Sequence, residues 1–177
     1  MTFTKEKRMN HAPFGNLEEQ LYAVTDTQEW KHLISGIKDA DVVYVIGNGG
    51  NMAVASHAAA DISRLTDKKV WCLDSQSLLT SIANDHGYEN IFKNWLEIYA
   101  NPNEKSMVLG FSGSGNSKNV VSALNWANER HNWSAALISG SKSNCIDESI
   151  PEINFSNEYF HQHEILSVMC FYEIVYN

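Results

Sequence analysis

The sequence has little of what a membrane or secreted protein needs. No apolar run approaches the roughly 18 residues of a membrane-spanning helix. The first residues, MTFTKEKRMNHAPFG, carry positive charges but lack the apolar stretch of a secretory signal. The 3 cysteines lie far apart without a CxxC pair, which is typical of reduced thiols in a cytosolic protein. We therefore expect a cytoplasmic protein with no membrane partner.

Positive charge is also scarce. The chain has 13 Lys and Arg residues against 21 Asp and Glu residues, a formal net charge of −8. A protein that binds nucleic acid needs a basic face, so we expect no nucleic-acid partner. A small anion is still a possible ligand, because backbone N–H groups at a helix N-terminus can hold a phosphate in an acidic protein.

The length of 177 residues fits one domain that can bury a core. The stretches LEEQLYAV and TDTQEWKHLISGIK carry apolar residues at helical spacing. We therefore predict a single domain over 1–177, with a helical N-terminal segment at 1–40.

Five apolar runs alternate with helical patterns along the rest of the chain. The predicted strands are 41–47, 70–74, 106–111, 134–140 and 152–155, and the predicted helices are 52–65, 78–85, 118–130 and 159–177. This alternation predicts an α/β fold, a three-layer doubly wound structure with a five-stranded parallel sheet. Ligands of such sheets bind beyond the carboxyl ends of the strands.

The first strand runs into a glycine-rich loop, Gly47-Asn48-Gly49-Gly50-Asn51. Glycine allows positive φ angles and a close approach of the backbone to a ligand. A simple tight turn between strand and helix explains the same residues. The loop is not GxGxxG, and no acidic residue ends a clean second strand, so we expect no nucleotide cofactor.

A second loop, 112–117, reads SGSGNS between a strand and a helix. Its serine hydroxyls and the free amides of the helix start are suitable partners for a phosphate monoester. The alternative is a flexible capped turn without a ligand.

Two further sets of polar residues lie on predicted helices. His57 and Asp61 are four residues apart, so they share one helix face, either as a functional pair or as a plain hydrogen bond. The C-terminal helix begins with HQHE (161–164), where polar residues commonly cap a helix or face water.

Three stretches, VVYVIGNGGNMAVASHAAADI, LLTSIANDHGYENIF and VLGFSGSGNSKNVVSALNWAN, resemble the SIS (sugar isomerase) domain family. Within it they are most similar to phosphoheptose isomerases, which interconvert sedoheptulose 7-phosphate and a heptose 7-phosphate for bacterial surface polysaccharide. The resemblance implies a flavodoxin-like sheet, a sugar-phosphate ligand and a homo-oligomer, tetramer or dimer. It implies sugar-phosphate contacts at Asn48, Gly49, Gly50, Asn51, Asn84, Asp85, Ser112, Gly113, Ser114 and Ser117.

The resemblance also places His57 and Asp61 where the family has a histidine and a glutamate that serve metal binding and proton transfer. Asp61 is then the expected base, with a pKa raised by burial. Either His57, or a zinc ion held by His57, Asp61 and His161, would stabilise the enediolate oxygen, which gives His161 a catalytic role as well.

The chain departs from the family pattern at several of these positions. Asn51 replaces a serine, and Asp61 replaces the longer glutamate. The family's C-terminal helix carries a glutamine and, eight positions on, a histidine. Aligning the helix ends puts His161 and Met169 there, and a shift by one puts Gln162 and Cys170, so the second histidine is absent in either case.

Two functions follow from these patterns. The first is a ketose/aldose isomerase acting on a sugar phosphate such as sedoheptulose 7-phosphate. The alternative is a non-catalytic SIS module that binds a phosphosugar or a protein partner as a regulator, which the missing histidine favours.

Overall fold

The computed structural model describes residues 13–177. Five strands form one all-parallel sheet in the order β2-β1-β3-β4-β5. The strands are β1 (Val42–Gly47), β2 (Lys69–Cys72), β3 (Ser106–Ser112), β4 (Trp133–Ser139) and β5 (Glu152–Asn154). The predicted α/β class and the five-stranded parallel sheet are confirmed.

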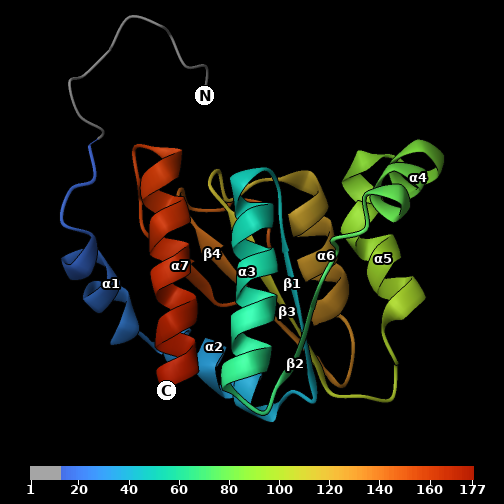
Figure 1. Ribbon diagram of the computed structural model, residues 1–177, viewed down its shortest axis with the longest axis horizontal. Coiled ribbons are helices and arrows are strands. Elements are labelled where there is room, and N and C mark those ends of the chain that lie inside the picture. Colours follow the sequence, from blue (N-terminus) through green and yellow to red (C-terminus); the bar gives the residue numbers. More distant parts are fainter. Residues whose placement is uncertain (1–12) are drawn as a thin grey trace, which may run out of the picture.

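Helices cover both faces of the sheet (Figure 1). One face is covered by α1 (Leu17–Thr25), α2 (Gln28–Asp39), α3 (Gly50–Leu65) and α7 (Phe160–Tyr176). The other face is covered by α4 (Gln76–His86), α5 (Ile91–Tyr99) and α6 (Lys118–Asn128), with a short 3₁₀ turn, η1 (Tyr88–Asn90), between α4 and α5. The structure therefore has three layers. Helices α1 and α2 lie within the predicted helical segment, whose residues 1–12 are outside the described residues.

The strands are apolar throughout because each of their faces meets a different core. In β1, Val43 and Val45 pack beneath α3 and α7, while Tyr44 and Ile46 pack beneath α5 and α6. Strand β3 alternates in the same way. Burial on both faces is what makes a parallel strand an unbroken apolar run in the sequence.

Helix α7 is apolar on several sides, and the structure gives an intramolecular reason. The helix packs against α3 on one side and α1 on another, as well as against the sheet. Phe171 and Ile174 are buried, whereas Tyr176 at the end of the helix is 83% exposed. The apolar pattern of α7 is thus explained within one chain. Among residues 13–177, no helix combines the length and apolar character needed to cross a membrane.

The segment 88–99 holds η1 and α5, which the sequence analysis did not predict. Ile91, Phe92, Trp95 and Leu96 form one buried stripe on α5. Their spacing of one, four and five residues is a helical pattern, so the signal was present in the sequence.

Candidate functional site

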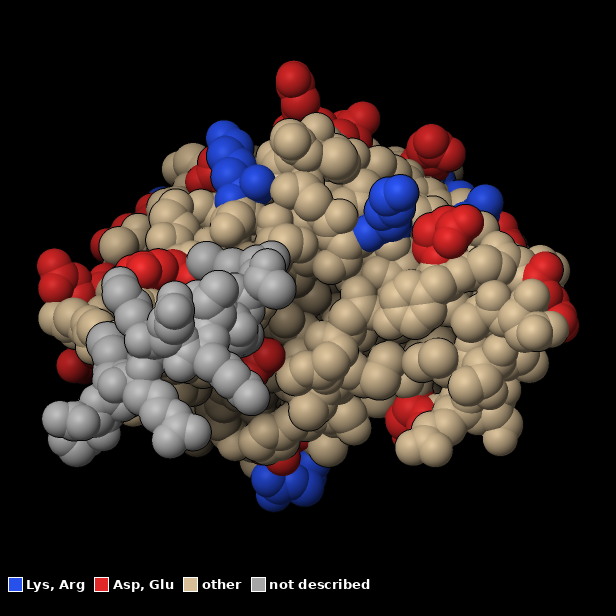
Figure 2. All heavy atoms as spheres, turned by 90° about the horizontal axis from the view of Figure 1, so that it is seen from above, with Lys and Arg blue, Asp and Glu red and all other residues tan. Residues whose placement is uncertain are grey.

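The two glycine-rich loops meet at the carboxyl edge of the sheet. Strands β1 and β3 are neighbours, with Gly47 paired to Phe111, so the loops that follow them start side by side. The chain leaves β1 for α3 on one face and leaves β3 for α6 on the other, which makes this the switch point where such sheets bind ligands. Figure 2 looks onto this edge, and the charged side chains visible there lie mostly round its rim.

Asn48 joins the first loop to helix α6 through side-chain hydrogen bonds. Its side-chain amide exchanges two hydrogen bonds of 2.8 Å with Asn119 on α6, and Tyr88 Oη donates to Asn48 Oδ1 at 3.0 Å. Gly49, with a φ of 58°, leaves the loop exposed beside this pair. Asn48, a predicted sugar contact, is therefore also the residue that joins the first loop to α6.

The loop 112–117, here called the serine loop, is fixed by the loop after β4. Asn116 Oδ1 accepts hydrogen bonds from Ser143 Oγ at 3.3 Å and from the Asn144 amide at 3.0 Å. Gly115 has a φ of 69°, and a Cβ atom there would collide with the Ser141 carbonyl oxygen. Glycine is required at this position because of both its backbone angle and the close approach.

The hydroxyls of the serine loop surround the start of α6. Ser112 Oγ donates to Ser117 Oγ at 3.1 Å, and Ser114 is exposed. Ser117 is the N-cap residue of α6, but its side chain makes no capping hydrogen bond. Among the first-turn amides of α6, that of Val120 donates to Asn119 Oδ1 at 3.0 Å. Ser117 caps none of them, and three hydroxyl groups lie beside this helix start, where they can accompany its amides around an anion.

Asn84 and Asp85 lie in the last turn of α4. Both are exposed, and Asn84 Nδ2 donates to Asp85 Oδ1 at 2.8 Å. Within residues 13–177 neither side chain has a hydrogen bond to the first loop or to the serine loop, so their contact with a sugar stays a prediction.

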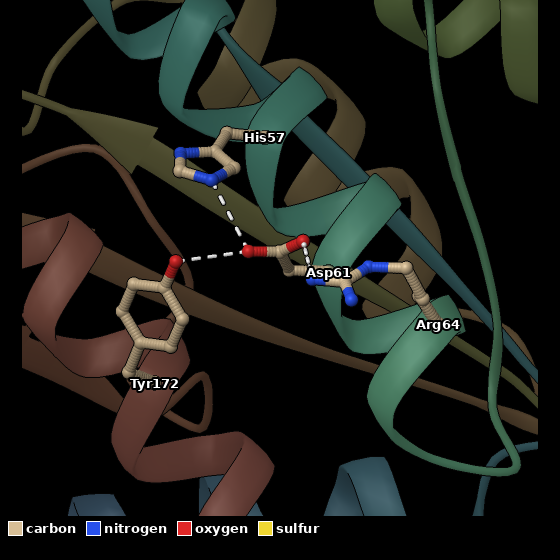
Figure 3. Close-up of polar contacts among 4 residues, drawn as sticks. All are labelled: His57, Asp61, Arg64 and Tyr172. Atoms are coloured by element: carbon tan, nitrogen blue, oxygen red, sulfur yellow. Dashed lines mark hydrogen bonds and ion pairs between the residues drawn. The ribbon is translucent and has the colours of Figure 1, made fainter.

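Asp61 is the centre of a polar cluster between α3 and α7 (Figure 3). Its Oδ2 accepts from Tyr172 Oη at 2.9 Å and lies 3.2 Å from His57 Nε2, while its Oδ1 accepts from Arg64 Nη2 at 2.9 Å. The His57 side chain is half exposed and also packs edge-on against the Phe171 ring. The predicted sharing of one helix face by His57 and Asp61 is confirmed.

The expectation that burial raises the pKa of Asp61 is wrong. Hydrogen bonds from Arg64 and then Tyr172 lower the pKa of this carboxyl below its ordinary value, and they outweigh the opposing effect of burial. Asp61 also lies 11 residues after Gly50, about 16 Å along the helix axis from the first loop. Asp61 is therefore a fixed, ionised group rather than a carboxyl poised to take up a proton.

The predicted zinc ligands do not come together. Among residues 13–177 no three His, Cys, Asp or Glu side chains gather as a metal site. Both Asp61 oxygens already accept hydrogen bonds, one of them from a guanidinium group whose charge would repel a metal ion. His161 Nε2 donates instead to the Pro13 carbonyl oxygen at 3.0 Å. The set His57, Asp61 and His161 does not fit zinc in this chain.

The structure brings His163, rather than His161, to the serine loop. The His163 side chain is 0% exposed and packs against Gly113 and Gly140, at the ends of β3 and β4. His161 packs edge-on against Phe14. The catalytic and metal roles were predicted for His161 and none for His163, because spacing alone does not tell which polar residue at the start of this helix faces the sheet.

Burial lowers the pKa of His163 from 6.5 to about 4. The unfolded chain therefore takes up a proton at His163 as the pH falls below 6.5, while the folded chain takes it up only near pH 4. As the pH is lowered from 6.5 to 4, the free energy of unfolding therefore decreases, by up to about 3 kcal/mol.

We expect the His163→Leu variant to lose less stability than the wild type when the pH is lowered from 7.5 to 4.5, as measured in urea titrations. An equal loss in both proteins would contradict this assignment.

Glu164 is a second residue of α7 that the sequence analysis left without a role. Its carboxylate lies against Gly50, where any Cβ atom would collide with it. Gly50 begins α3, and a carboxylate is stabilised at a helix N-terminus. The first loop thus has a negative group beside it.

The comparison with known proteins agrees with this geometry. Residues 27–139 match the model of the SIS domain family, and these residues include both loops and the four strands β1 to β4. The chain belongs to the SIS domain family. The resemblance inferred from the sequence motifs is confirmed.

Relatives of this SIS domain include phosphoheptose isomerases. The enzyme of Geobacter metallireducens is 38% identical over 104 residues, which cover 55% of this chain and 54% of the relative. The enzyme of Geotalea uraniireducens is 36% identical over 116 residues, which cover 62% of this chain and 58% of the relative. The chain thus spans only a little over half the length of these relatives.

A solved structure extends the similarity in fold beyond these matching stretches. The phosphoheptose isomerase of Neisseria gonorrhoeae superposes with a TM-score of 0.73 at 19% identity, over 90% of this chain and 89% of that one. The similarity in fold therefore extends well beyond the stretches that match in sequence.

Proposed function

We propose that this SIS domain is an aldose-ketose isomerase that acts on a sugar phosphate such as sedoheptulose 7-phosphate. The observation that supports this most is the serine loop, which joins three hydroxyls to the uncapped start of α6 at the switch point of the sheet. The phosphoheptose isomerases among its relatives support the same reaction.

The charges of the site give the ligand one orientation. The carboxylate of Glu164 lies beside the first loop and repels a phosphate there. The serine loop offers hydroxyls and amides, which suit a phosphate. The phosphate therefore binds at the serine loop, and the sugar extends past the first loop and α3.

The proton transfer is assigned to His57, with Asp61 as the group that orients it. Asp61 Oδ2 accepts the Nε2 proton of His57, which leaves Nδ1 free to accept a proton. Nδ1 takes a proton from C1 of the ketose, and an enediolate forms. The proton of the O1 hydroxyl then passes to O2, and the same nitrogen returns a proton to C2, which gives the aldose with its carbonyl at C1. Arg64 and Tyr172 keep Asp61 ionised and in place throughout.

A turnover assay tests this function directly. The purified protein is incubated with sedoheptulose 7-phosphate and with a panel of hexose and pentose phosphates, and the aldose formed is measured. We expect conversion of at least one ketose phosphate. Binding of these compounds without any conversion would contradict the proposal and support the regulatory alternative.

We also propose that the protein acts in the cytoplasm, in the biosynthesis of surface polysaccharide, and that it self-associates as a tetramer or dimer. Large apolar side chains are exposed on the face away from α7, among them Trp71 on the edge strand β2 and Ile98 and Tyr99 on α5. Exposed aromatic side chains of this size are typical of interfaces.

Light scattering measures the self-association. The chain has a mass of 19.9 kDa, so we expect a particle of two or four times this mass at micromolar concentration. Trp71→Lys should shift the equilibrium toward the monomer. A wild-type protein that scatters as a monomer would contradict this proposal.

A further inference from the structure

The hydroxyl of Ser114 is oriented by a neighbour in the serine loop, Asn116. The Asn116 backbone N–H donates to Ser114 Oγ at 3.2 Å, and Asn116 Nδ2 donates to the Ser114 carbonyl oxygen at 3.0 Å. The hydroxyl oxygen of Ser114 is therefore an acceptor within the loop, which leaves its proton for another partner. Ser114 is exposed, so this proton can be donated to a phosphate oxygen.

The orientation of Asn116 depends in turn on the loop after β4. Its Oδ1 accepts from two donors of that loop, Ser143 Oγ at 3.3 Å and the Asn144 N–H at 3.0 Å. Two donors at Oδ1 fix which end of the side-chain amide faces them, and Nδ2 is thereby directed toward Ser114. The geometry of the Ser114 hydroxyl is therefore determined by residues that follow a different strand.

Glu152 holds this second loop from the edge strand β5. Its Oε1 accepts from the Ser143 N–H at 2.7 Å and from Ser139 Oγ at 2.6 Å. Ser139 is 0% exposed at the end of β4, and its Oγ also accepts from Asn154 Nδ2 at 2.8 Å. Both distances to the carboxylate are short, as is typical of hydrogen bonds to a charged acceptor. One carboxylate oxygen thus joins the end of β4 to the loop that positions Asn116.

The surroundings of Glu152 differ from those of an ordinary surface carboxylate. Its side chain is only partly exposed, and it has no ion pair within residues 13–177. Removing a charged group from water costs free energy, which here is offset by the two hydrogen bonds to the loop. Asp147, in the same connection, instead bonds to Ser149 two residues on, so it orders that connection locally.

We propose that Glu152 is a positioning residue for the phosphate, which acts through Ser143 and Asn116 on the Ser114 hydroxyl. This inference rests on the proposed function in placing the phosphate at the serine loop. It adds a residue of the edge strand β5 that strengthens phosphate binding without contacting the phosphate. Because the contact concerns binding and not proton transfer, it should affect KM and leave kcat unchanged.

Calorimetry with inorganic phosphate measures this effect on the full chain. Glu152→Ala should weaken phosphate binding about tenfold, as the loss of one or two hydrogen bonds does. Glu152→Gln keeps an acceptor oxygen for Ser143 and Ser139, so its affinity should stay within about twofold of the wild type. With a sugar phosphate as substrate, Glu152→Ala should raise KM about tenfold at an unchanged kcat.

Asp147→Ala is the matched control for the alanine variant. It also removes a carboxylate that accepts from a serine N–H and a serine hydroxyl in the connection between β4 and β5. Asp147 is not joined to Asn116 by these bonds, so phosphate affinity should stay as in the wild type. Asn116→Ala interrupts the same route nearer to Ser114, and it should give the loss of affinity by itself if Glu152→Ala fails to fold.

A double-mutant cycle with Ser114→Ala tests the route itself. Residues that act on one contact have effects that do not add. Once Ser114→Ala has removed the hydroxyl, Glu152→Ala should therefore cause no further loss of phosphate affinity. A general loosening of the loop would instead weaken binding in both backgrounds.

Three results overturn the inference: an alanine variant that binds phosphate like the wild type, a loss that glutamine does not restore, and a loss that persists in the Ser114→Ala background. Turnover decides the isomerase function separately. A phosphate affinity that depends on Glu152 in a protein without turnover would leave the positioning role assigned and the isomerase proposal refuted. Turnover with an affinity independent of Glu152 would do the reverse.

Discussion

Asp61→Asn is expected to lower the turnover of a sugar phosphate by about 100-fold or more, the contribution of a positioned acid–base group. The asparagine is similar in size but no longer carries the charge that holds His57 Nε2–H and pairs with Arg64. His57 then loses its fixed tautomer and orientation, which proton transfer requires. Affinity for the sugar phosphate should change much less, because the phosphate contacts are assigned to the serine loop. Turnover and binding are measured on the same preparation.

Asp147→Asn is the matched control for this variant. Asp147 is an exposed carboxylate whose pKa is also lowered, in its case by hydrogen bonds from Ser149. It belongs to the connection between β4 and β5, before β5 begins at the opposite edge of the sheet. Turnover should remain normal in this control. If the Asp61→Asn variant turns over the sugar phosphate as fast as the wild type, neither Asp61 nor its contact with His57 is needed for catalysis.

The double variant Ser114→Ala, Ser117→Ala is expected to weaken sugar-phosphate binding by about 10- to 100-fold, or roughly 1–3 kcal/mol. The two hydroxyls lie at the uncapped start of α6 and are assigned to the phosphate oxygens. Hydrogen bonds to a charged group are the stronger ones, so their loss has a large effect on affinity. Calorimetry with inorganic phosphate and with a sugar phosphate measures the change.

Ser149→Ala serves as the control for the serine variants. Ser149 is exposed and bonds to Asp147 in the connection before β5, at the opposite edge of the sheet. This change should leave both affinities as they are. Unaltered binding by the double serine variant would remove the serine loop from the site.

The strands and most helices followed from the sequence because each has a local signal. Val42–Gly47 is an unbroken apolar run since both of its faces are buried, and the loops after β1 and β3 carry glycines that break such runs. The order of the strands depends instead on contacts across the chain. It was available only through the resemblance to a flavodoxin-like family.

The site was predictable to the extent that it lies on local motifs. The serine loop and the His57–Asp61 pair came from spacing alone. The low pKa of Asp61 could not be predicted from the sequence, because one of the groups that causes it, Tyr172, is 111 residues away. The same holds for His163, whose burial depends on Gly113 and Gly140, each at the end of a different strand.

Hydrogen exchange at the substrate tests the central claim most directly, because isomerisation through an enediolate must break the bond between carbon and hydrogen next to the carbonyl. Sedoheptulose 7-phosphate is incubated with the protein in D₂O and followed by proton NMR. The account predicts deuterium at C1 of the ketose and at C2 of the aldose, at a rate that Asp61→Asn reduces about 100-fold. A protein that binds this compound, as well as the other ketose phosphates of the panel, without incorporating deuterium into any of them would contradict it.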